Sequence, residues 1–240
     1  MFLININCLF KQHEQAEDNR GRTRDTRGIS GLYNYRFELI TGPMSCGKTE
    51  ELLRRLRRAT IAGKKIKVFS PQLDTRVLAD CIESRTGSRR QAMKIQKASD
   101  ILNYICQEDE VIAIDELQFF DNEIVFVIRT LIANGKKVIG AGLELDFKEE
   151  PFGSMPQLMC YADKIDKLSA ICMKCGSELG VRTQRLIDGI PADINSPLIM
   201  IGGDETYEAK CINCYEINNE FHSIKGTNES KRKQEFICTK

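Results

Sequence analysis

Apolar and polar positions follow two different periods between residue 36 and about residue 168 of this 240-residue chain. Short apolar runs predict buried strands at residues 35–41, 65–70, 110–115 and 136–143. Apolar residues at helical spacing predict helices at residues 50–62, 100–107 and 121–134. Because strands and helices alternate with short links, we expect a parallel sheet with right-handed crossovers, which is an α/β fold.

The first predicted helix has a strongly basic outer face, which carries Arg54, Arg55, Arg57 and Arg58. We interpret it as a solvated face, the usual role of such a stripe, and contact with phosphates is the less favoured alternative. From residue 169 the helical period disappears and paired cysteines begin. A domain boundary is therefore predicted near residue 169.

Residues 42–49 match the phosphate-binding pattern G-x-x-x-x-G-K-[ST], between a predicted strand and a predicted helix. The glycines permit backbone angles at which successive N–H groups point inward at phosphate oxygens. Lys48 would reach the β- and γ-phosphates, and the Thr49 hydroxyl would ligate magnesium. A glycine turn without function is the alternative, but an eight-residue match in this setting is rare by chance. We therefore predict a nucleotide site at Gly42, Pro43, Met44, Ser45, Cys46, Gly47, Lys48 and Thr49.

Two acids, Asp115 and Glu116, come directly after the predicted strand at residues 110–115. Their position is the carboxyl edge of the sheet, where parallel α/β sheets bind ligands. Asp115 is predicted to hold Mg²⁺, directly or through water, and Glu116 is a candidate base for an acceptor hydroxyl or a water. A strand that merely ends in solvated acids is the alternative, and the neighbouring phosphate loop favours the functional interpretation.

Four of the ten cysteines form two C-x-x-C pairs, Cys172/Cys175 and Cys211/Cys214, with 35 residues between them. Four thiolates in two pairs predict a closed tetrahedral site for structural Zn²⁺, and a redox dithiol is the competing interpretation. Such a metal would anchor both ends of the intervening loop. The loop contains an apolar segment, Leu198–Gly203, and then Tyr207. It is either a lid over a flat polar ligand or a β-hairpin, and the residues alone leave both open.

Composition limits the class of protein but does not indicate its chemistry. Apolar residues make up 42% and charged residues 29%, as in an ordinary globular protein. The formal charge of +1 gives no electrostatic argument for nucleic acid or membrane as a partner, and no apolar run is long enough to span a bilayer. The scattered remaining cysteines favour a reducing, cytoplasmic setting.

Six motifs in order give the chain a specific resemblance: GPMSCGKTEEL, DTR, AIDELQFF, GLELDFKEEPFG, LSAICMKCG and IMIGGDETYEAKCINCY. Over roughly residues 36–216 it resembles the type II, zinc-containing cellular thymidine kinases. The resemblance implies a RecA-like P-loop NTPase sheet with a small zinc-binding lasso domain. It also implies transfer of the γ-phosphate of ATP to the 5′-hydroxyl of thymidine, in nucleotide salvage for DNA synthesis, by a homotetramer.

By motif position, the resemblance assigns residues to three groups. Glu116 would be the base and Arg76 would hold the transferring phosphates or the acceptor, while Asp115 and Gln118 complete the ATP and Mg²⁺ site. The thymidine site would comprise Leu143, Phe147, Phe152, Thr183, Leu198, Met200, Gly202 and Tyr207. The zinc ligands would be Cys172, Cys175, Cys211 and Cys214.

The chain departs from the family pattern at three sites. Many members have Phe-Ser or Asn-Ala where this chain has Ser45-Cys46, and a tyrosine where it has Val77. The Ser-His-x-Gly found downstream in many members is Ser84-Arg85-Thr86-Gly87 here, which adds a positive charge to which the sequence assigns no role.

The expected domains are a disordered N-terminal extension (1–35), a P-loop ATP-binding α/β domain (36–168), a zinc-anchored lasso and substrate lid (169–216), and a polar tail (217–240). The alternative function is a RecA-like ATPase whose zinc knuckle binds nucleic acid, which would require a basic or aromatic platform near the cysteines. Charges of both signs around Cys172–Cys214 argue against that platform. A regulator without turnover is disfavoured by the intact Lys48, Thr49, Asp115 and Glu116.

Overall fold

The structure is a computed structural model that describes residues 36–72, 80–198 and 205–217, all within one compact unit, Tyr35–Lys240. Three predicted site residues, Arg76, Met200 and Gly202, lie outside the described residues, as do the segments 1–35 and 218–240. Within the described part, none of the helices has the length and apolar character needed to cross a bilayer. The predicted domain boundary at residue 169 stays a prediction.

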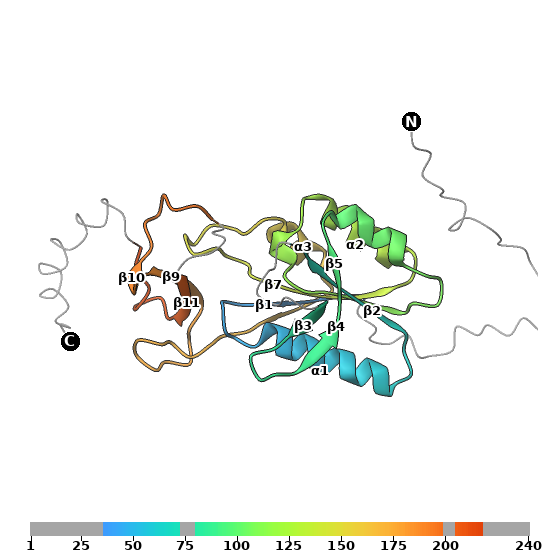
Figure 1. The fold of residues 1–240 in the computed structure, drawn as a ribbon, viewed down its shortest axis with the longest axis horizontal. Helices are drawn as coiled ribbons and strands as arrows, with labels where there is room; N and C mark the ends of the chain where they lie inside the picture. Colours follow the sequence, from blue (N-terminus) through green and yellow to red (C-terminus); the bar gives the residue numbers. More distant parts are fainter. Residues whose placement is uncertain (1–35, 73–79, 199–204, 218–240) are drawn as a thin grey trace, which may run out of the picture. The chain divides into compact units, whose positions relative to one another are not determined.

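A six-stranded parallel sheet forms the centre of this unit, as the alternating pattern predicts (Figure 1). Its order is β5-β2-β6-β7-β1-β8, and every neighbouring pair is parallel. The strands are β1 (Phe37–Thr41), β2 (Ile66–Pro71), β5 (Met93–Ile95), β6 (Val111–Ile114), β7 (Lys137–Gly142) and β8 (Lys164–Lys167). The predicted fold class, an α/β parallel sheet beside a cysteine-bearing module, is confirmed.

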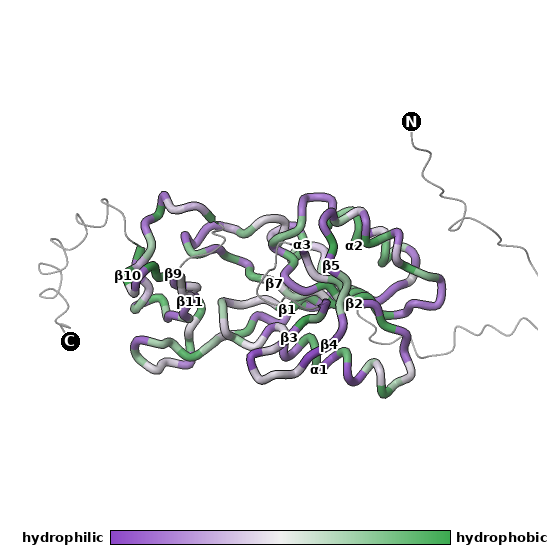
Figure 2. The backbone as a smooth tube through the Cα atoms, in the orientation of Figure 1, coloured by the Kyte–Doolittle hydropathy of each residue, from purple (hydrophilic) through white to green (hydrophobic). Residues whose placement is uncertain are grey.

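Helices cover both faces of the sheet, so the central strand β6 is apolar and buried throughout (Figures 1 and 2). In β6, Ile112 and Ile114 belong to the hydrophobic cluster of α2, whereas Val111 and Ala113 belong to that of α1. The helical elements are α1 (Lys48–Ile61), α2 (Glu123–Ala133), α3 (Met155–Tyr161) and the 3₁₀-helices η2 (Ala98–Tyr104) and η3 (Leu117–Phe119).

The short elements were not predictable from periodicity. The helix predicted at residues 100–107 is the 3₁₀-helix η2, which ends at Tyr104. The antiparallel pair β3 (Cys81–Glu83) and β4 (Arg89–Gln91), with β5, α3 and β8, carried no signal. Each has only three to seven residues, too few to show a period.

A second, antiparallel sheet follows in the cysteine-bearing part of the chain. Its strands, in the order β10-β9-β11, are β9 (Arg182–Ile187), β10 (Ile190–Pro191) and β11 (Glu205–Lys210). β9 and β11 pair with Thr183 opposite Ala209 and Arg185 opposite Tyr207. The pairing brings together strands on either side of residues 199–204, which are outside the described part of the chain.

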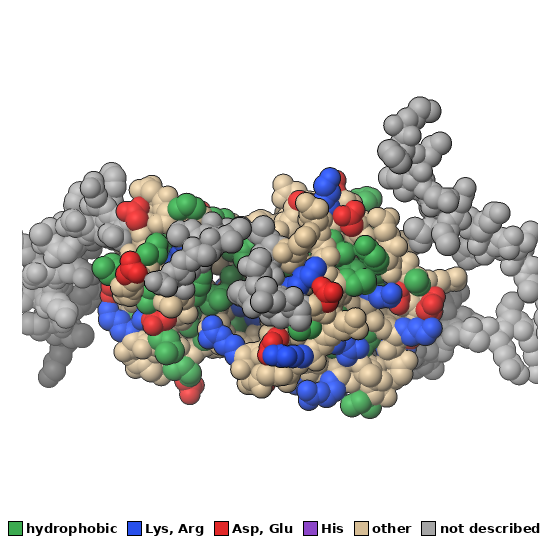
Figure 3. Space-filling view, in the orientation of Figure 1, with side chains coloured by type: hydrophobic (Ala, Val, Ile, Leu, Met, Phe, Trp, Pro, Cys, Tyr) green, Lys and Arg blue, Asp and Glu red, His purple; other side chains and the backbone are tan. Residues whose placement is uncertain are grey.

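The basic face of α1 is only partly solvated, and the interpretation of Arg55 as a solvated residue is wrong. Its side chain is 10% exposed and pairs with Glu38 at 2.7 Å, with Glu51 at 2.8 Å, and with Asp166. Acids from β1, α1 and β8 converge on it because these elements are neighbours in space, which the linear sequence does not reveal. Elsewhere, on the face drawn in Figure 3, basic and acidic side chains are interspersed.

Candidate functional site

The phosphate loop lies between β1 and α1, as predicted, and its first residue is closely enclosed. Gly42 has φ 141°, and a Cβ on it would lie 2.5 Å from the carbonyl oxygen of Leu168. Only glycine fits this conformation and this space. Lys48 Nζ donates to the carbonyl oxygens of Gly42 at 3.0 Å and Pro43 at 2.6 Å. Burial raises the pKa of the Cys46 thiol, so this loop cysteine is a neutral packing group at pH 7.

Glu144 holds the start of the loop. Its Oε2 accepts a hydrogen bond of 2.7 Å from the Thr41 hydroxyl and another of 2.7 Å from the Gly42 N–H. The residue is 6% exposed, and Lys167 Nζ lies 3.4 Å from its other oxygen. Because β7 and β1 are adjacent, Glu144, two residues after the end of β7, reaches the loop that follows β1. The phosphate loop is therefore tied to the sheet by a buried carboxylate.

Asp115 lies beside the threonine of the phosphate loop. The Thr49 hydroxyl donates to Asp115 Oδ2 at 3.0 Å, although 66 positions separate the residues. The Asp115 N–H donates to the carbonyl oxygen of Phe69 at 3.0 Å, which fixes it at the carboxyl edge of the sheet. A hydroxyl and a carboxylate are hard oxygen donors of the kind that Mg²⁺ prefers, so the two groups fit a magnesium site.

Glu116 is buried in an unusual backbone conformation. It is 9% exposed and has φ 52°, the left-handed region that few residues other than glycine adopt. The side-chain amide of Gln118 donates to its carboxylate and accepts the Leu143 N–H at 3.0 Å. Gln118, assigned by motif to the ATP and Mg²⁺ site, is thus in contact with Glu116, and it orients that carboxylate.

The phosphate loop and the two acids line a cavity of about 570 Å³. Its lining includes the acids Asp115 and Glu116, residues 82–86 at the end of β3 and in the turn that follows it, and the phosphate-loop residues Met44, Ser45, Gly47, Lys48 and Thr49. The volume is in the range of small-molecule sites in proteins. Among the described residues that line it, none of the predicted thymidine contacts is found.

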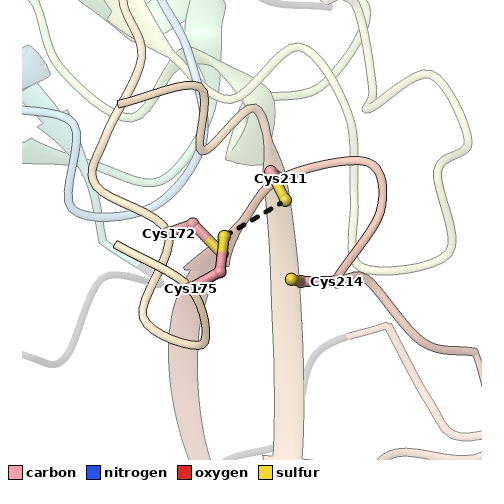
Figure 4. A group of neighbouring side chains, drawn as sticks. All are labelled: Cys172, Cys175, Cys211 and Cys214. Carbon is pink, nitrogen blue, oxygen red and sulfur yellow. Dashed lines mark hydrogen bonds between the residues drawn. The ribbon is translucent and has the colours of Figure 1, made fainter. Parts of the chain in front are cut away.

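Four cysteine thiols form a compact cluster (Figure 4). The Sγ atoms of Cys172, Cys175, Cys211 and Cys214 all lie within 4.8 Å of one another. The distance between Sγ of Cys175 and Sγ of Cys211 is 3.8 Å. A tetrahedron with Zn–S bonds of ~2.3 Å has edges of about 3.8 Å, so this donor set fits zinc. The cluster could therefore hold a zinc ion in a closed, structural site.

The thiols also influence one another's protonation. Hydrogen bonds from backbone N–H groups, that of Cys211 first, lower the pKa of Cys172 to about 6. Hydrogen bonds with the thiols of Cys211 and Cys175 raise the pKa of Cys214 to about 12. Neighbouring thiolates repel one another, so the cluster retains a proton. A bound divalent cation would displace that proton and offset the negative charge of the thiolates.

The second sheet contacts the phosphate loop and the predicted acceptor residues. The Met44 N–H donates to the hydroxyl of Thr183 on β9 at 3.0 Å. Arg185, also on β9, is fully buried, with its guanidinium 5.0 Å from the ring centre of Phe147 and 6.0 Å from that of Tyr207. The rings of Phe147 and Tyr207 thus both lie near the buried guanidinium of Arg185.

The other predicted acceptor residues are less closely grouped. Phe152 packs edge-on against Phe119, with ring centres 5.5 Å apart. Leu143 is 6% exposed and its N–H is taken by Gln118, whereas Leu198 is 38% exposed.

A comparison with protein families agrees with the motifs. A family model of thymidine kinase matches residues 35–215. The chain belongs to the thymidine kinase family. Two solved structures with some likeness are the Pif1 helicase from Candida albicans and a DNA replication initiation factor, both at 14% identity. Their TM-scores are 0.34 and 0.36, and the matches cover 54% and 56% of this chain. This chain spans 35% and 40% of their length, and likeness at this level carries no argument about its function.

Membership of the thymidine kinase family supports a nucleoside kinase function for the site. Sequence reasoning missed two members of it, Glu144 and Arg185. Glu144 had a usable signal, because it is an acid close after a buried strand, as Asp115 is. Arg185 had none, since a single arginine in a polar stretch is most often exposed.

Proposed function

We propose that the protein transfers the γ-phosphate of ATP to the 5′-hydroxyl of thymidine, with ADP as the second product. The observation that carries the proposal is the contact between Thr49 and Asp115, with Glu116 next in sequence, in a chain of the thymidine kinase family. We further propose a cytoplasmic homotetramer that serves nucleotide salvage for DNA synthesis. Its partners would be ATP and thymidine rather than nucleic acid or a membrane.

The donor nucleotide would bind on the phosphate loop. Lys48, now hydrogen-bonded to loop carbonyls, would exchange these for the β- and γ-phosphates of ATP. Thr49 and Asp115 would hold Mg²⁺, which would supply positive charge to offset that of the phosphates. Gln118 would act at the same site through Glu116. Arg76 would place a positive charge beside the phosphoryl group during its transfer, as its motif implies.

Glu116 would act as the base. The 5′-hydroxyl oxygen forms a bond to the γ-phosphorus, the bond from that phosphorus to the β-phosphate oxygen breaks, and the hydroxyl proton passes to the Glu116 carboxylate. The hydrogen bond from Gln118 and the strained backbone at Glu116 support this role, because both fix the carboxylate in one orientation. Most of the catalysis would come from positioning and charge.

The thymine base would lie among Leu143, Phe147, Phe152, Thr183, Leu198, Met200, Gly202 and Tyr207. Two contacts support a site near the second sheet. Thr183 touches the phosphate loop at Met44, and Phe147 and Tyr207 share Arg185. Aromatic walls with backbone hydrogen bonds suit a flat, uncharged base. Zinc at the four cysteines would stabilise the segment that carries Thr183 and Tyr207.

The test is phosphate transfer from ATP to a panel of nucleosides by the wild-type protein and Glu116→Gln. We expect thymidine to be the preferred acceptor and Glu116→Gln to lower kcat by roughly 10²–10⁴-fold, the usual contribution of a general base, with little change in the KM for ATP. ATP hydrolysis that is independent of nucleoside, or stimulated by nucleic acid, would favour the alternative ATPase instead.

A further inference from the structure

The β3–β4 hairpin lines the phosphate-loop cavity together with residues that the motifs identify. The lining residues from this hairpin are Ile82 and Glu83 of β3 and Ser84, Arg85 and Thr86 of the turn that follows it. They share the cavity with Lys48, Thr49, Asp115 and Glu116. The turn contains Ser84-Arg85-Thr86-Gly87, the segment whose arginine departs from the family pattern and has no role in the function proposed above.

The conformation of this turn is fixed by its own hydrogen bonds. Ser84 is 5% exposed, and its N–H donates to the Ser88 carbonyl oxygen at 2.9 Å. Its hydroxyl accepts the Ser88 N–H at 3.2 Å and lies 2.8 Å from that of Thr86. Gly87 closes the turn with φ 84° and donates its N–H to the Ser84 carbonyl oxygen at 2.9 Å. Ser84, Thr86, Gly87 and Ser88 thus build the turn, and Arg85 is an exposed residue within it that lines the cavity.

The turn is also anchored to α1, the helix that follows the phosphate loop. Ile82 is 4% exposed and belongs to the same hydrophobic cluster as Leu52 and Leu56 of α1. Arg90, on β4, donates to the Thr60 hydroxyl near the end of α1 at 3.0 Å. The arginine at the tip of the turn is therefore held at a defined place relative to the phosphate loop.

Several carboxylates line the cavity, so an anionic ligand that binds there depends on the nearby positive charge of Arg85. Among the described residues that line it, the cationic ones are Lys48 and Arg85, and the acidic ones are Glu50, Glu83, Asp115 and Glu116. Glu83 is paired with Arg89 at 2.8 Å, and this contact raises the pKa of Arg89. Among the described residues Arg85 makes no ion pair. A polyphosphate that enters this cavity needs cations to offset these carboxylates.

We propose that Arg85 binds the γ-phosphoryl group of the donor nucleotide and stabilises it during transfer. The inference rests on the proposed function, because it takes ATP as the donor. The γ-phosphoryl group is favoured over the rest of the nucleotide because Arg85 shares the cavity with the proposed metal ligands and the base Glu116. A guanidinium donates two parallel hydrogen bonds to phosphoryl oxygens and stays charged at every physiological pH. It takes no proton and forms no covalent bond.

Arg85→Ala, Arg85→Lys and Arg85→His test the proposal, with Arg89→Ala as the matched control. Arg89 is on the same hairpin and has the same charge, but it does not line the cavity. In Arg85→Ala we expect kcat to fall about 10²-fold or more, as when a transition-state donor is lost. Arg85→Lys should recover part of the rate, and Arg89→Ala should stay within about twofold of the wild type.

Arg85→His adds a pH readout that a purely structural role would not produce. A histidine is charged below its ordinary pKa of ~6.5 and neutral above it. The rate of Arg85→His relative to wild type should therefore fall as the pH rises from about 5.5 to 8. The ratio for Arg85→Lys should stay flat over this range, because lysine remains charged.

Calorimetry without acceptor separates this inference from the proposed function. Arg85→Ala should weaken binding of the β,γ-imido analogue of ATP with Mg²⁺ and leave ADP binding within about twofold of wild type, because ADP lacks the γ-phosphoryl group. Equal losses for both nucleotides, no loss for either, or equal effects of Arg85→Ala and Arg89→Ala would overturn the proposal. If the wild type phosphorylates no nucleoside, the proposed function fails, and this binding comparison still decides the role of Arg85.

Discussion

The carboxylate of Glu144 accepts the N–H of Gly42 at 2.7 Å, although the two residues are 102 positions apart. The same oxygen accepts the Thr41 hydroxyl, so one buried acid holds the last residue of β1 and the first residue of the phosphate loop. The Gly42 N–H therefore binds protein, and the residues that follow it remain to bind phosphate. The loop is held in place before the nucleotide arrives, which lowers the entropy cost of binding.

Glu144→Ala should weaken both the fold and ATP binding. It removes the acceptor of the buried Gly42 N–H, at a cost of about 1–3 kcal/mol. The Thr41 hydroxyl loses Glu144 but can still donate to the Gly142 carbonyl oxygen at 3.1 Å. We expect the KM for ATP to rise roughly tenfold, which corresponds to about 1.4 kcal/mol of lost loop positioning. Glu144→Gln keeps an oxygen acceptor and should retain most of the stability. Exposed Glu150→Ala is the control, and an unchanged KM in Glu144→Ala would contradict this role.

Gly42→Ala should abolish nucleotide binding. The new methyl would lie 2.5 Å from the Leu168 carbonyl oxygen and 2.7 Å from Cys46 Sγ, at φ 141°. Gly63→Ala is a control for backbone strain alone, because Gly63 has φ 73° but open space around it. It should cost about 1–2 kcal/mol in unfolding free energy and leave ATP binding unchanged. Thermal unfolding and nucleotide titration of both variants check this, and normal ATP affinity in Gly42→Ala would count against the loop geometry.

Zinc removal should loosen the cysteine-bearing part of the chain first. We expect about one zinc ion per chain, and its removal should raise amide hydrogen exchange in residues 169–198 and 205–217 before it does so in the parallel sheet. Cys172→Ser should lose the metal, whereas Cys160→Ser, at an exposed cysteine of α3, should keep it. Equal metal content in the two variants would show that the cluster is not the zinc site.

The ion pairs of Glu51 should give a stability difference that depends on pH. Hydrogen bonds from Arg54, with further contributions from Arg55, lower the pKa of Glu51 to about 2 from an ordinary value of 4.5. The stabilisation is therefore complete above pH 4.5 and is lost as the pH falls toward 2. Glu51→Gln should lower the unfolding free energy by about 0.5–1 kcal/mol at pH 7, since the pairs are partly exposed. Denaturant unfolding at pH 7 and at pH 3 should show that the difference in unfolding free energy between the wild type and Glu51→Gln is smaller at pH 3. A gap that is constant with pH, or equal in the exposed Glu50→Gln control, would refute this.

The sequence predicted those parts of the protein that short, contiguous signals encode. The strands around the phosphate loop have long apolar runs, and residues 42–49 and the cysteine pairs are motifs with fixed spacing. Asp115 could be placed near Thr49 because carboxyl ends of parallel strands meet at one edge of a sheet. The contact between the two residues is the finding that this reasoning foresaw.

What the sequence did not predict depends on which strands are neighbours. Glu144 reaches Gly42 because β7 lies beside β1, and Arg55 pairs with Asp166 because β8 lies on the other side of β1. Strand order is set by packing over the whole sheet, so local patterns do not carry it. Arg85 lies in a hairpin whose strands have three residues each. Such strands are too short to show an alternation of apolar and polar residues, so the sequence did not predict the position of Arg85.

The most direct test of the account is the product balance of the wild-type protein with Mg²⁺, ATP and thymidine. The measurement separates ADP, inorganic phosphate and nucleotide products and identifies the position of the new phosphate by ³¹P NMR. The account predicts ADP and thymidine 5′-monophosphate in about equal amounts, with ADP formation dependent on thymidine. ADP and free phosphate formed at the same rate without thymidine, with no nucleoside phosphate, would contradict it.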